Sequence, residues 1–227
     1  MQSKSKFYLL VLFLVLSSSV VCGQSEKKVA YGILIDNTGS LRSQFEQVLN
    51  LGKAVARHAT QKGPVSVFNF TSPADRRSTL AVISSGSDWS QDGEDLSSFI
   101  DNIYVLGGQT TLLDAIQSMS RTVSAKVTQE KDVFSDGVLI LITDGEERES
   151  RIKESDLIKQ LQKDGTKVFA IGLVKDLGAG NAFGSKGKQE KAENLLWKLA
   201  RETGGRVIFP ESRNMVADML VGDLFAP

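Results

Sequence analysis

The chain has 227 residues, and its 27 Lys and Arg residues are balanced by 27 Asp and Glu residues. With no basic excess, a nucleic-acid partner or an anionic membrane partner is not expected. The only cysteine is Cys22, near the N-terminus, so disulfides and thiol chemistry are excluded for the rest of the chain. Residues 24–227 are enough for one large domain and too few for two ordinary ones, which predicts a single domain stabilised by its core alone.

The first 23 residues have the order of a secretory signal peptide. Two lysines precede an unbroken apolar run, Phe7–Leu16, and a stretch of small residues follows it. The apolar run is shorter than the ~20 residues that a membrane-spanning helix needs. We therefore predict export to the periplasm or the extracellular space, with cleavage between Gly23 and Gln24. Two alternatives stay open, an uncleaved N-terminal anchor and lipoprotein processing at Cys22.

Beyond this segment, apolar β-branched runs alternate with longer segments of helical periodicity. The first half is predicted to hold, in order, a strand at Val29–Ile35, a helix at Leu41–Thr60, strands at Val65–Phe70 and Thr79–Ile83, a loop over Ser84–Asp95 and a helix at Asp95–Ile103. The second half is predicted to hold a helix at Leu112–Val127, a strand at Val138–Ile142, a helix at Ser155–Lys163, a strand at Lys167–Val174, a helix at Gln189–Glu202, a strand at Arg206–Phe209 and a helix at Asn214–Leu224.

This alternation predicts an α/β fold. Strands as apolar as Ile33–Ile35 and Val138–Ile142 are typical of a mostly parallel sheet that is buried on both faces. Right-handed crossovers then give a doubly wound central sheet with helices on both faces. In such sheets ligands bind beyond the carboxyl ends of the strands, at the point where the winding reverses. The loops that follow the strands are therefore the place to look for function.

Three loops combine short oxygen-bearing side chains with glycine. They are Asp36-Asn37-Thr38-Gly39-Ser40 after the first strand, Gly107-Gly108-Gln109-Thr110-Thr111 before the long helix, and Thr143-Asp144-Gly145 after the strand Val138–Ile142. The oxygen donors that they offer together are Asp36, Thr38, Ser40, Thr110 and Asp144. Such a set suits a hard cation, which means Mg²⁺, Mn²⁺ or Ca²⁺. Because these loops contain no His or Cys, zinc and copper are not expected.

The first loop resembles the Asp-x-Ser-x-Ser element of the metal-ion-dependent adhesion site in von Willebrand factor A domains, and the other two resemble that site's distant threonine and aspartate. The resemblance extends from Val29 to about Phe209. The segment 195–206, with the sequence LLWKLARETGGR, is similar to the end of a bacterial, exported subgroup of these domains.

This resemblance implies a role for each predicted ligand. Thr38, Ser40 and Thr110 would contact the metal, whereas Asp36 and Asp144 would act directly or through water. Thr38 stands where the family more often has serine, but it keeps the hydroxyl group. Thr111 is the alternative to Thr110, because both follow the glycine pair.

Three neutral hydroxyls and two carboxylates would leave a divalent ion partly positive. An octahedral ion such as Mg²⁺ would keep a coordination position for an incoming oxygen. We therefore predict a non-enzymatic module, exported from a bacterial cell, that binds a Glu or Asp side chain of a protein partner through the metal.

Two rival interpretations stay open. Asp36-Asn37-Thr38-Gly39 also fits a haloacid-dehalogenase type of phosphoryl-transfer enzyme, in which Asp36 would be the nucleophile. The other rival is a structural domain of the same fold that binds no metal. A further acidic group, Glu146, Glu147 and Glu149, is interpreted as a solvated helix start, since acidic side chains favour helix N-termini.

Overall fold

The computed structural model describes residues 27–70, 83–106, 110–177, 185–211 and 216–226. The predicted signal peptide, residues 1–23, lies outside the described residues. The helices of the described part of the chain include none that is long and apolar enough to cross a membrane.

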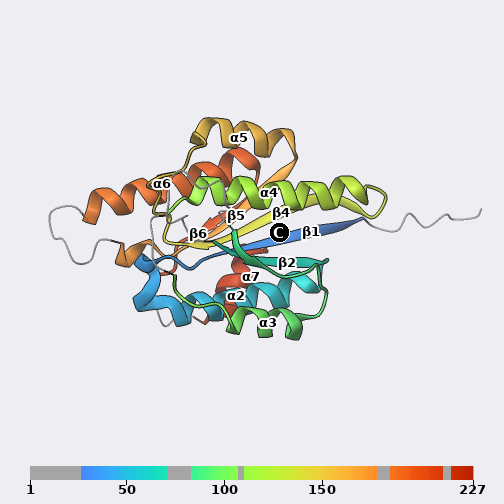
Figure 1. Ribbon diagram of the computed structural model, residues 1–227, viewed down its shortest axis with the longest axis horizontal. Coiled ribbons are helices and arrows are strands. Elements are labelled where there is room, and N and C mark those ends of the chain that lie inside the picture. The colour runs from blue at the N-terminus through green and yellow to red at the C-terminus, as the bar shows by residue number, and fades with distance from the viewer. Residues whose placement is uncertain (1–26, 71–82, 107–109, 178–184, 212–215, 227) are drawn as a thin grey trace, which may run out of the picture.

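A six-stranded sheet in the order β3-β2-β1-β4-β5-β6 forms the centre of the molecule (Figure 1). The strands are β1 (Lys28–Asp36), β2 (Val65–Phe70), β3 (Ile83–Gly86), β4 (Phe134–Thr143), β5 (Thr166–Gly172) and β6 (Val207–Ile208). Every pairing is parallel except that of β3, which runs antiparallel to β2 at one edge. The predicted doubly wound, mostly parallel sheet is confirmed.

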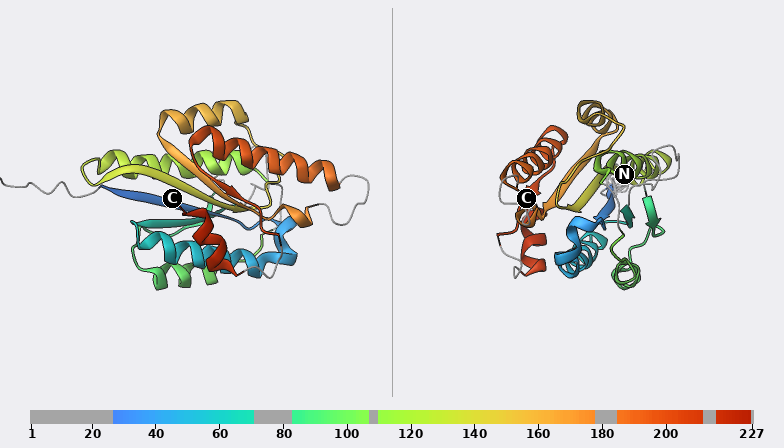
Figure 2. Two further views of the ribbon diagram at one scale, coloured as in Figure 1. Left: turned by 180° about the vertical axis from the view of Figure 1, so that it is seen from behind. Right: turned by 60° about the vertical axis from the view of Figure 1, so that its left-hand side comes forward.

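Helices cover both faces of the sheet (Figure 2). The helical segments are η1 (Gly39–Gln44), α2 (Phe45–Thr60), α3 (Gly93–Asp101), α4 (Leu112–Gln129), α5 (Glu154–Lys163), η2 (Val174–Asp176), α6 (Ser185–Thr203) and α7 (Ala217–Leu224). One apolar core lies under α2, α3 and α7, and a second lies under α4, α5 and α6. The right-hand view in Figure 2 shows the sheet between these two layers.

The two central strands contribute to both cores. On β1, Ile33 and Ile35 face the first core and Leu34 faces the second. Val138–Ile142 on β4 alternates in the same way, and each of its side chains is buried. This is why these segments read as continuous apolar runs rather than as alternating ones.

Gly32 on β1 allows α4 to pack closely on the sheet. A β-carbon at Gly32 would collide with the side chains of Met119 and Val123, which lie on the buried face of α4. The position therefore requires glycine for close approach and not for backbone conformation.

The winding of the sheet reverses between β1 and β4. From β1 the chain moves outward through β2 to β3, then returns to β4 on the other side of β1. Ile35 pairs with Ile142 in register, so Asp36 and Thr143 come next at the carboxyl ends of the two neighbouring strands. The first and third predicted loops thus start at the point where such sheets bind ligands.

Two element predictions need correction. The edge strand was expected at Thr79–Ile83, but residues 79–82 lie outside the described residues and β3 continues to Gly86, into the predicted loop. Antiparallel pairing with β2 overrides the low strand propensity of Ser and Gly there. The helix expected from Leu41 begins instead as a 3-10 turn and becomes an α-helix only at Phe45.

Candidate metal centre

Asp36 ends β1 with a carboxylate that is 0% exposed and bonded on both oxygens. Its Oδ1 atom accepts hydrogen bonds from the Thr38 amide at 3.0 Å and from Thr38 Oγ1 at 2.7 Å. Its Oδ2 atom accepts a 2.6 Å hydrogen bond from Thr143 Oγ1. Asp36 therefore holds one hydroxyl from each of two loops.

Ser40 connects this group to Asp144. The hydroxyl oxygens of Thr38 and Ser40 lie 3.2 Å apart. Burial raises the pKa of Asp144, and hydrogen bonding by the Ser40 side chain partly opposes that rise. Asp144 is 1% exposed, and its Oδ1 atom also accepts from the Glu146 amide at 2.9 Å. Four of the five predicted ligands thus lie in one cluster, in which Asp36, Thr38 and Asp144 are buried and Ser40 is exposed.

Thr110, the fifth predicted ligand, is buried beside the loop that follows Asp144. Its carbonyl oxygen accepts from the amides of Arg148 at 3.0 Å and Glu149 at 3.3 Å. Residues 107–109 lie outside the described residues. Thr111 is buried too, and its Oγ1 atom has no hydrogen-bond partner in the described part of the chain. The preference for Thr110 over Thr111 as the ligand stays a prediction.

Hydrogen bonds connect the three loops. The Asn37 Nδ2 group donates to the Tyr104 carbonyl at 3.0 Å, and the Asn37 carbonyl accepts from the Leu106 amide at 2.9 Å. These bonds join the first loop to the segment just before the second loop, and the Thr143–Asp36 bond joins the first loop to the third. Together with the Thr110 contacts, they fix all three loops at one edge of the sheet.

The acidic group after Asp144 does not start a helix, which corrects the sequence interpretation. Residues 144–153 are irregular, and α5 begins at Glu154. The Glu147 carboxylate accepts from the Leu113 amide at 2.9 Å and from the Ser150 amide at 2.8 Å. Asp114 in turn accepts from the Ile152 amide at 3.0 Å. The segment wraps around the first turn of α4, where helical amides lack partners of their own.

Burial makes the cluster electrostatically unfavourable without a cation. Burial is the main cause that raises the pKa of Asp36 to about 7, and the nearby charge of Asp144 adds to it. Burial also raises the pKa of Asp144. A bound cation would offset both effects. The described residues contain no cluster of three or more His, Cys, Asp or Glu side chains that could hold a metal, so a cation here would depend on hydroxyl ligands as well.

Two residues of the cluster were absent from the predicted ligand set. Thr143 bonds to Asp36, and Asn37 holds the segment just before the second loop. Both stood in the loops singled out from the sequence, and Thr143 could have been found from strand register, because Ile142 pairs with Ile35 and the next positions must be neighbours. No feature of the sequence indicated that the side-chain amide of Asn37 would hold that segment.

The arrangement is that of an α/β domain with buried oxygen donors at the switch point of its sheet. The chain belongs to the von Willebrand factor type A domain family, whose model matches residues 32–220. Domains of this family are typically protein-interaction modules rather than enzymes. No curated protein sequence matches the chain significantly.

Solved structures show the same fold at low sequence identity. Proximal thread matrix protein 1 from the mussel byssus is 15% identical with a TM-score of 0.61, over 87% of this chain and 47% of that one. The pilus adhesin SpaC from Lactobacillus rhamnosus GG, in its open conformation, is 12% identical with a TM-score of 0.57, over 88% of this chain and 30% of that one. The present chain thus matches less than half the length of either protein.

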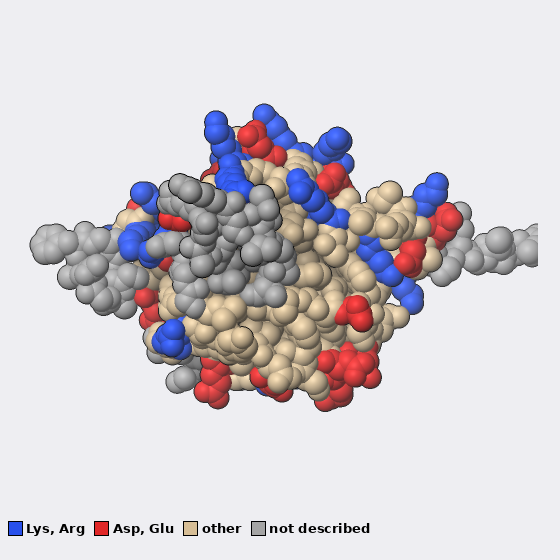
Figure 3. Space-filling model, in the orientation of Figure 1, with Lys and Arg blue, Asp and Glu red and all other residues tan. Residues whose placement is uncertain are grey.

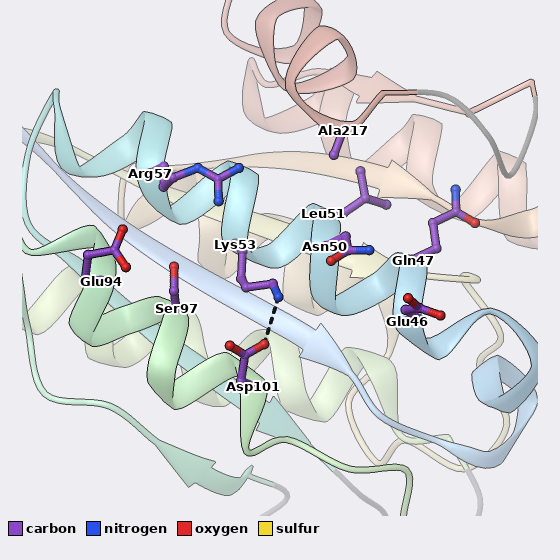
Figure 4. Close-up of a pocket in the computed structure, with 10 residues that line it drawn as sticks. All are labelled: Glu46, Gln47, Asn50, Leu51, Lys53, Arg57, Glu94, Ser97, Asp101 and Ala217. Atoms are coloured by element: carbon purple, nitrogen blue, oxygen red, sulfur yellow. Dashed lines mark hydrogen bonds and ion pairs between the residues drawn. The ribbon is translucent and has the colours of Figure 1, made fainter.

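Two further surface features lie outside the cluster. A polar hollow of about 760 Å³ lies between α2 and α3 and is bridged by the Lys53–Asp101 ion pair at 2.8 Å (Figure 4). None of the predicted ligands lines it. Figure 3 shows Asp and Glu side chains gathered along the lower edge, over α2 and α3, and most Lys and Arg side chains over the opposite helix layer.

Proposed function

We propose that this chain is an exported module that binds a partner protein through a divalent cation. The observation that carries the proposal is the cluster of Asp36, Thr38, Ser40 and Asp144 at the switch point of the sheet, in which all but the exposed Ser40 are buried. Two carboxylates at 0% and 1% exposure, in a family of interaction modules, favour a bound cation over an empty structural turn.

The donor chemistry supports Mg²⁺, with Mn²⁺ and Ca²⁺ as alternatives. Thr38, Ser40 and Thr110 would supply hydroxyl oxygens, and Asp36 and Asp144 would act directly or through water. Asp36 already accepts bonds at both oxygens, which favours a role in orienting the hydroxyl ligands. Asn37 Oδ1 and Thr111 Oγ1 lack partners among the described residues, so the same loops have acceptors left for water molecules of a hydrated ion.

The partner that fits such a site is a protein with an exposed Asp or Glu. A bound divalent ion would supply a Lewis-acidic position that one carboxylate oxygen could complete. The residues of this chain would hold the ion at the rim of the sheet largely through neutral hydroxyls, and the two carboxylates, which also accept hydrogen bonds from the protein, would share their charge with those donors.

The phosphoryl-transfer alternative has less support. A nucleophilic carboxylate must have a reactive oxygen that can reach the substrate. In this chain Asp36 is fully buried, and both of its oxygens accept hydrogen bonds. The family to which the chain belongs is also one of interaction modules.

Export is the second part of the proposal. It rests on the charged and apolar N-terminal segment, residues 1–23, and on the lack of cysteine after residue 22. The site of action would then be the periplasm or the extracellular space.

Metal-dependent capture tests the proposal. Purified protein would be immobilised and incubated with extracellular and envelope proteins of the native host in Mg²⁺ or in EDTA. We expect a partner that elutes with EDTA and that is not captured by Asp144→Ala or Thr110→Ala, provided both variants keep the unfolding midpoint of the metal-free wild type. A partner that binds the wild type and Asp144→Ala equally, with and without metal, would place the interface elsewhere.

A further inference from the structure

A hollow of about 230 Å³ lies next to the buried cluster, between the segment after Asp144 and the first turns of α6. Its volume is close to that of one large side chain. Two parts of the chain that are far apart in the sequence form its walls, residues 145–148 from the β4–α5 connection and residues 188–195 from α6.

The rim of the hollow carries three cationic side chains, Arg148, Lys188 and Lys191. Glu146 holds two of them: its carboxylate lies 2.6 Å from Arg148 and 3.9 Å from Lys188. The Glu146 side chain is only 11% exposed, whereas those of Arg148 and Lys188 are 45% and 51% exposed. Glu146 therefore contacts Arg148 and Lys188 from the buried side, and the side chains of both cations remain partly exposed to solvent.

The floor of the hollow is apolar. Ala192 and Leu195 of α6 are buried there, together with Leu177. Lys188, Ala192 and Leu195 lie four and then three residues apart, and such residues share one face of a helix. One face of α6 therefore carries Lys188 at the rim of the hollow and Ala192 and Leu195 on its buried floor.

The hollow is tied directly to the predicted metal ligands. The Glu146 amide donates to Asp144 Oδ1 at 2.9 Å, and the Gly145 amide donates to Thr143 Oγ1 at 3.0 Å. One short segment therefore carries a metal ligand at one end and the anchor of the cation pair two residues later.

The charge of the hollow favours an anion. The wall holds a second acid, Glu147, which accepts from the amides of Leu113 and Ser150 and keeps its negative charge. Glu146 and Glu147 together offset two of the three cations that line the hollow, Arg148, Lys188 and Lys191. A cation that occupied the neighbouring centre would offset Asp36 and Asp144, which would leave the rim positive overall.

We propose that this hollow is a second subsite for the partner, which takes a carboxylate at its rim and the methylene groups of that side chain on its floor. The partner segment would therefore be acidic, with one carboxylate for the metal and a second, a glutamate, for Arg148, Lys188 and Lys191. This inference rests on the proposed function and adds the chemistry of the partner to it.

The test uses two sets of ten-residue Gly/Ser peptides. Peptides of the first set contain one central Asp, and those of the second set contain in addition one Glu at one to five positions after the Asp. Affinity for the full mature chain is measured by biolayer interferometry in Mg²⁺ and in EDTA. The variant Lys188→Ala/Lys191→Ala removes the two α6 cations. Its matched control, Lys159→Ala/Lys163→Ala, removes two exposed lysines of α5 and changes the net charge equally.

We expect at least one two-acid peptide to bind the wild type roughly tenfold more tightly than the one-acid peptides in Mg²⁺, the gain of one charge-assisted contact. The gain disappears in Lys188→Ala/Lys191→Ala and persists in the α5 control. If the one-acid peptides bind in Mg²⁺ and a second acid adds nothing, or the gain survives loss of the α6 lysines, the second subsite is refuted and the metal site stands. If no peptide binds better in Mg²⁺ than in EDTA, the proposed function fails and the subsite fails with it.

Discussion

Thr143 Oγ1 lies 2.6 Å from Asp36 Oδ2 and donates a hydrogen bond that joins the carboxyl ends of the two central strands. The same Thr143 oxygen accepts from the Gly145 amide at 3.0 Å. One hydroxyl therefore fixes both the orientation of the Asp36 carboxylate and the start of the turn that carries Asp144. This makes Thr143 a positioning residue for the predicted metal ligands on both strands.

Thr143→Val keeps the shape of the side chain and removes this hydrogen bond. Because it leaves a buried carboxylate oxygen without its donor, the free energy of unfolding should fall by about 1–3 kcal/mol. Urea denaturation in EDTA measures the loss. Thr143→Ser, which restores the hydroxyl, serves as the control and should recover most of it. An unchanged unfolding midpoint for Thr143→Val would contradict the role assigned to this bond.

Mg²⁺ or Mn²⁺ should stabilise the folded protein. A ligand that binds only the native state adds about 2.7 kcal/mol at a concentration of one hundred times its dissociation constant. Asp36→Asn should weaken this response and leave the metal-free fold intact. Differential scanning calorimetry with a metal titration checks both points, with Asp132→Asn, a change of an exposed carboxylate, as the control. If saturating metal leaves the wild-type unfolding midpoint unchanged, the metal centre does not exist.

The metal-free protein should lose stability as the pH rises. Burial, with the nearby charge of Asp144, raises the pKa of Asp36 from 3.8 to about 7 in the folded state. A carboxyl group with a raised pKa favours folding while it is protonated, and this contribution is lost between about pH 4 and pH 7. Urea unfolding in EDTA from pH 5 to pH 8 should show the decline. Asp36→Asn should show a smaller one, and parallel curves for the two proteins would refute this assignment.

Glu147→Gln should weaken metal binding and have a smaller effect on the free energy of unfolding. The Glu147 carboxylate accepts from the Leu113 amide and from Ser150, so it holds the first turn of α4 against the loop that carries Asp144. Replacing one acceptor oxygen by an amide group loosens that contact, and we expect a several-fold weaker Mn²⁺ affinity by calorimetry. Faster hydrogen exchange at the Leu113 amide would locate the effect. Glu130→Gln, at an exposed ion pair with Lys126, should change neither quantity.

The exported protein should begin at or near Gln24. The prediction rests on the apolar run Phe7–Leu16 and the small residues that follow it. Intact-mass measurement of protein purified from the native host is the check. Retention of Met1 in a soluble cytosolic protein would contradict it, and a lipid attached at Cys22 would establish the lipoprotein alternative.

The order of elements and the sheet could be predicted because their signals are local. Continuous apolar runs such as Val138–Ile142 indicate strands that are buried on both faces, and helical periodicity marked every long helix. The extension of the edge strand β3 from Ile83 to Gly86 could not be predicted, because Ser and Gly become a strand there only by pairing with β2. Its position is set by a tertiary contact.

The candidate site also has a part that could be predicted from local sequence and a part that could not. Asp36, Thr38 and Ser40 stand out because they follow an apolar strand within five residues of sequence. The hydrogen bonds that join the loops, from Asn37 to the Tyr104 carbonyl and from the Leu113 amide to Glu147, link residues 67 and 34 positions apart. A backbone group has no side-chain identity to show in a sequence, so these bonds could not be predicted from residue types.

The close packing of α4 on Gly32 has a mechanical consequence for the loop that carries Thr110. Met119 and Val123 rest directly on the glycine, and Thr110 lies just before the first turn of the same rigid helix. Any side chain added at Gly32 would push the middle of α4 away from the sheet. Because Thr110 lies just before the N-terminal end of α4, a methyl group at Gly32, four residues before Asp36, would displace this buried predicted ligand.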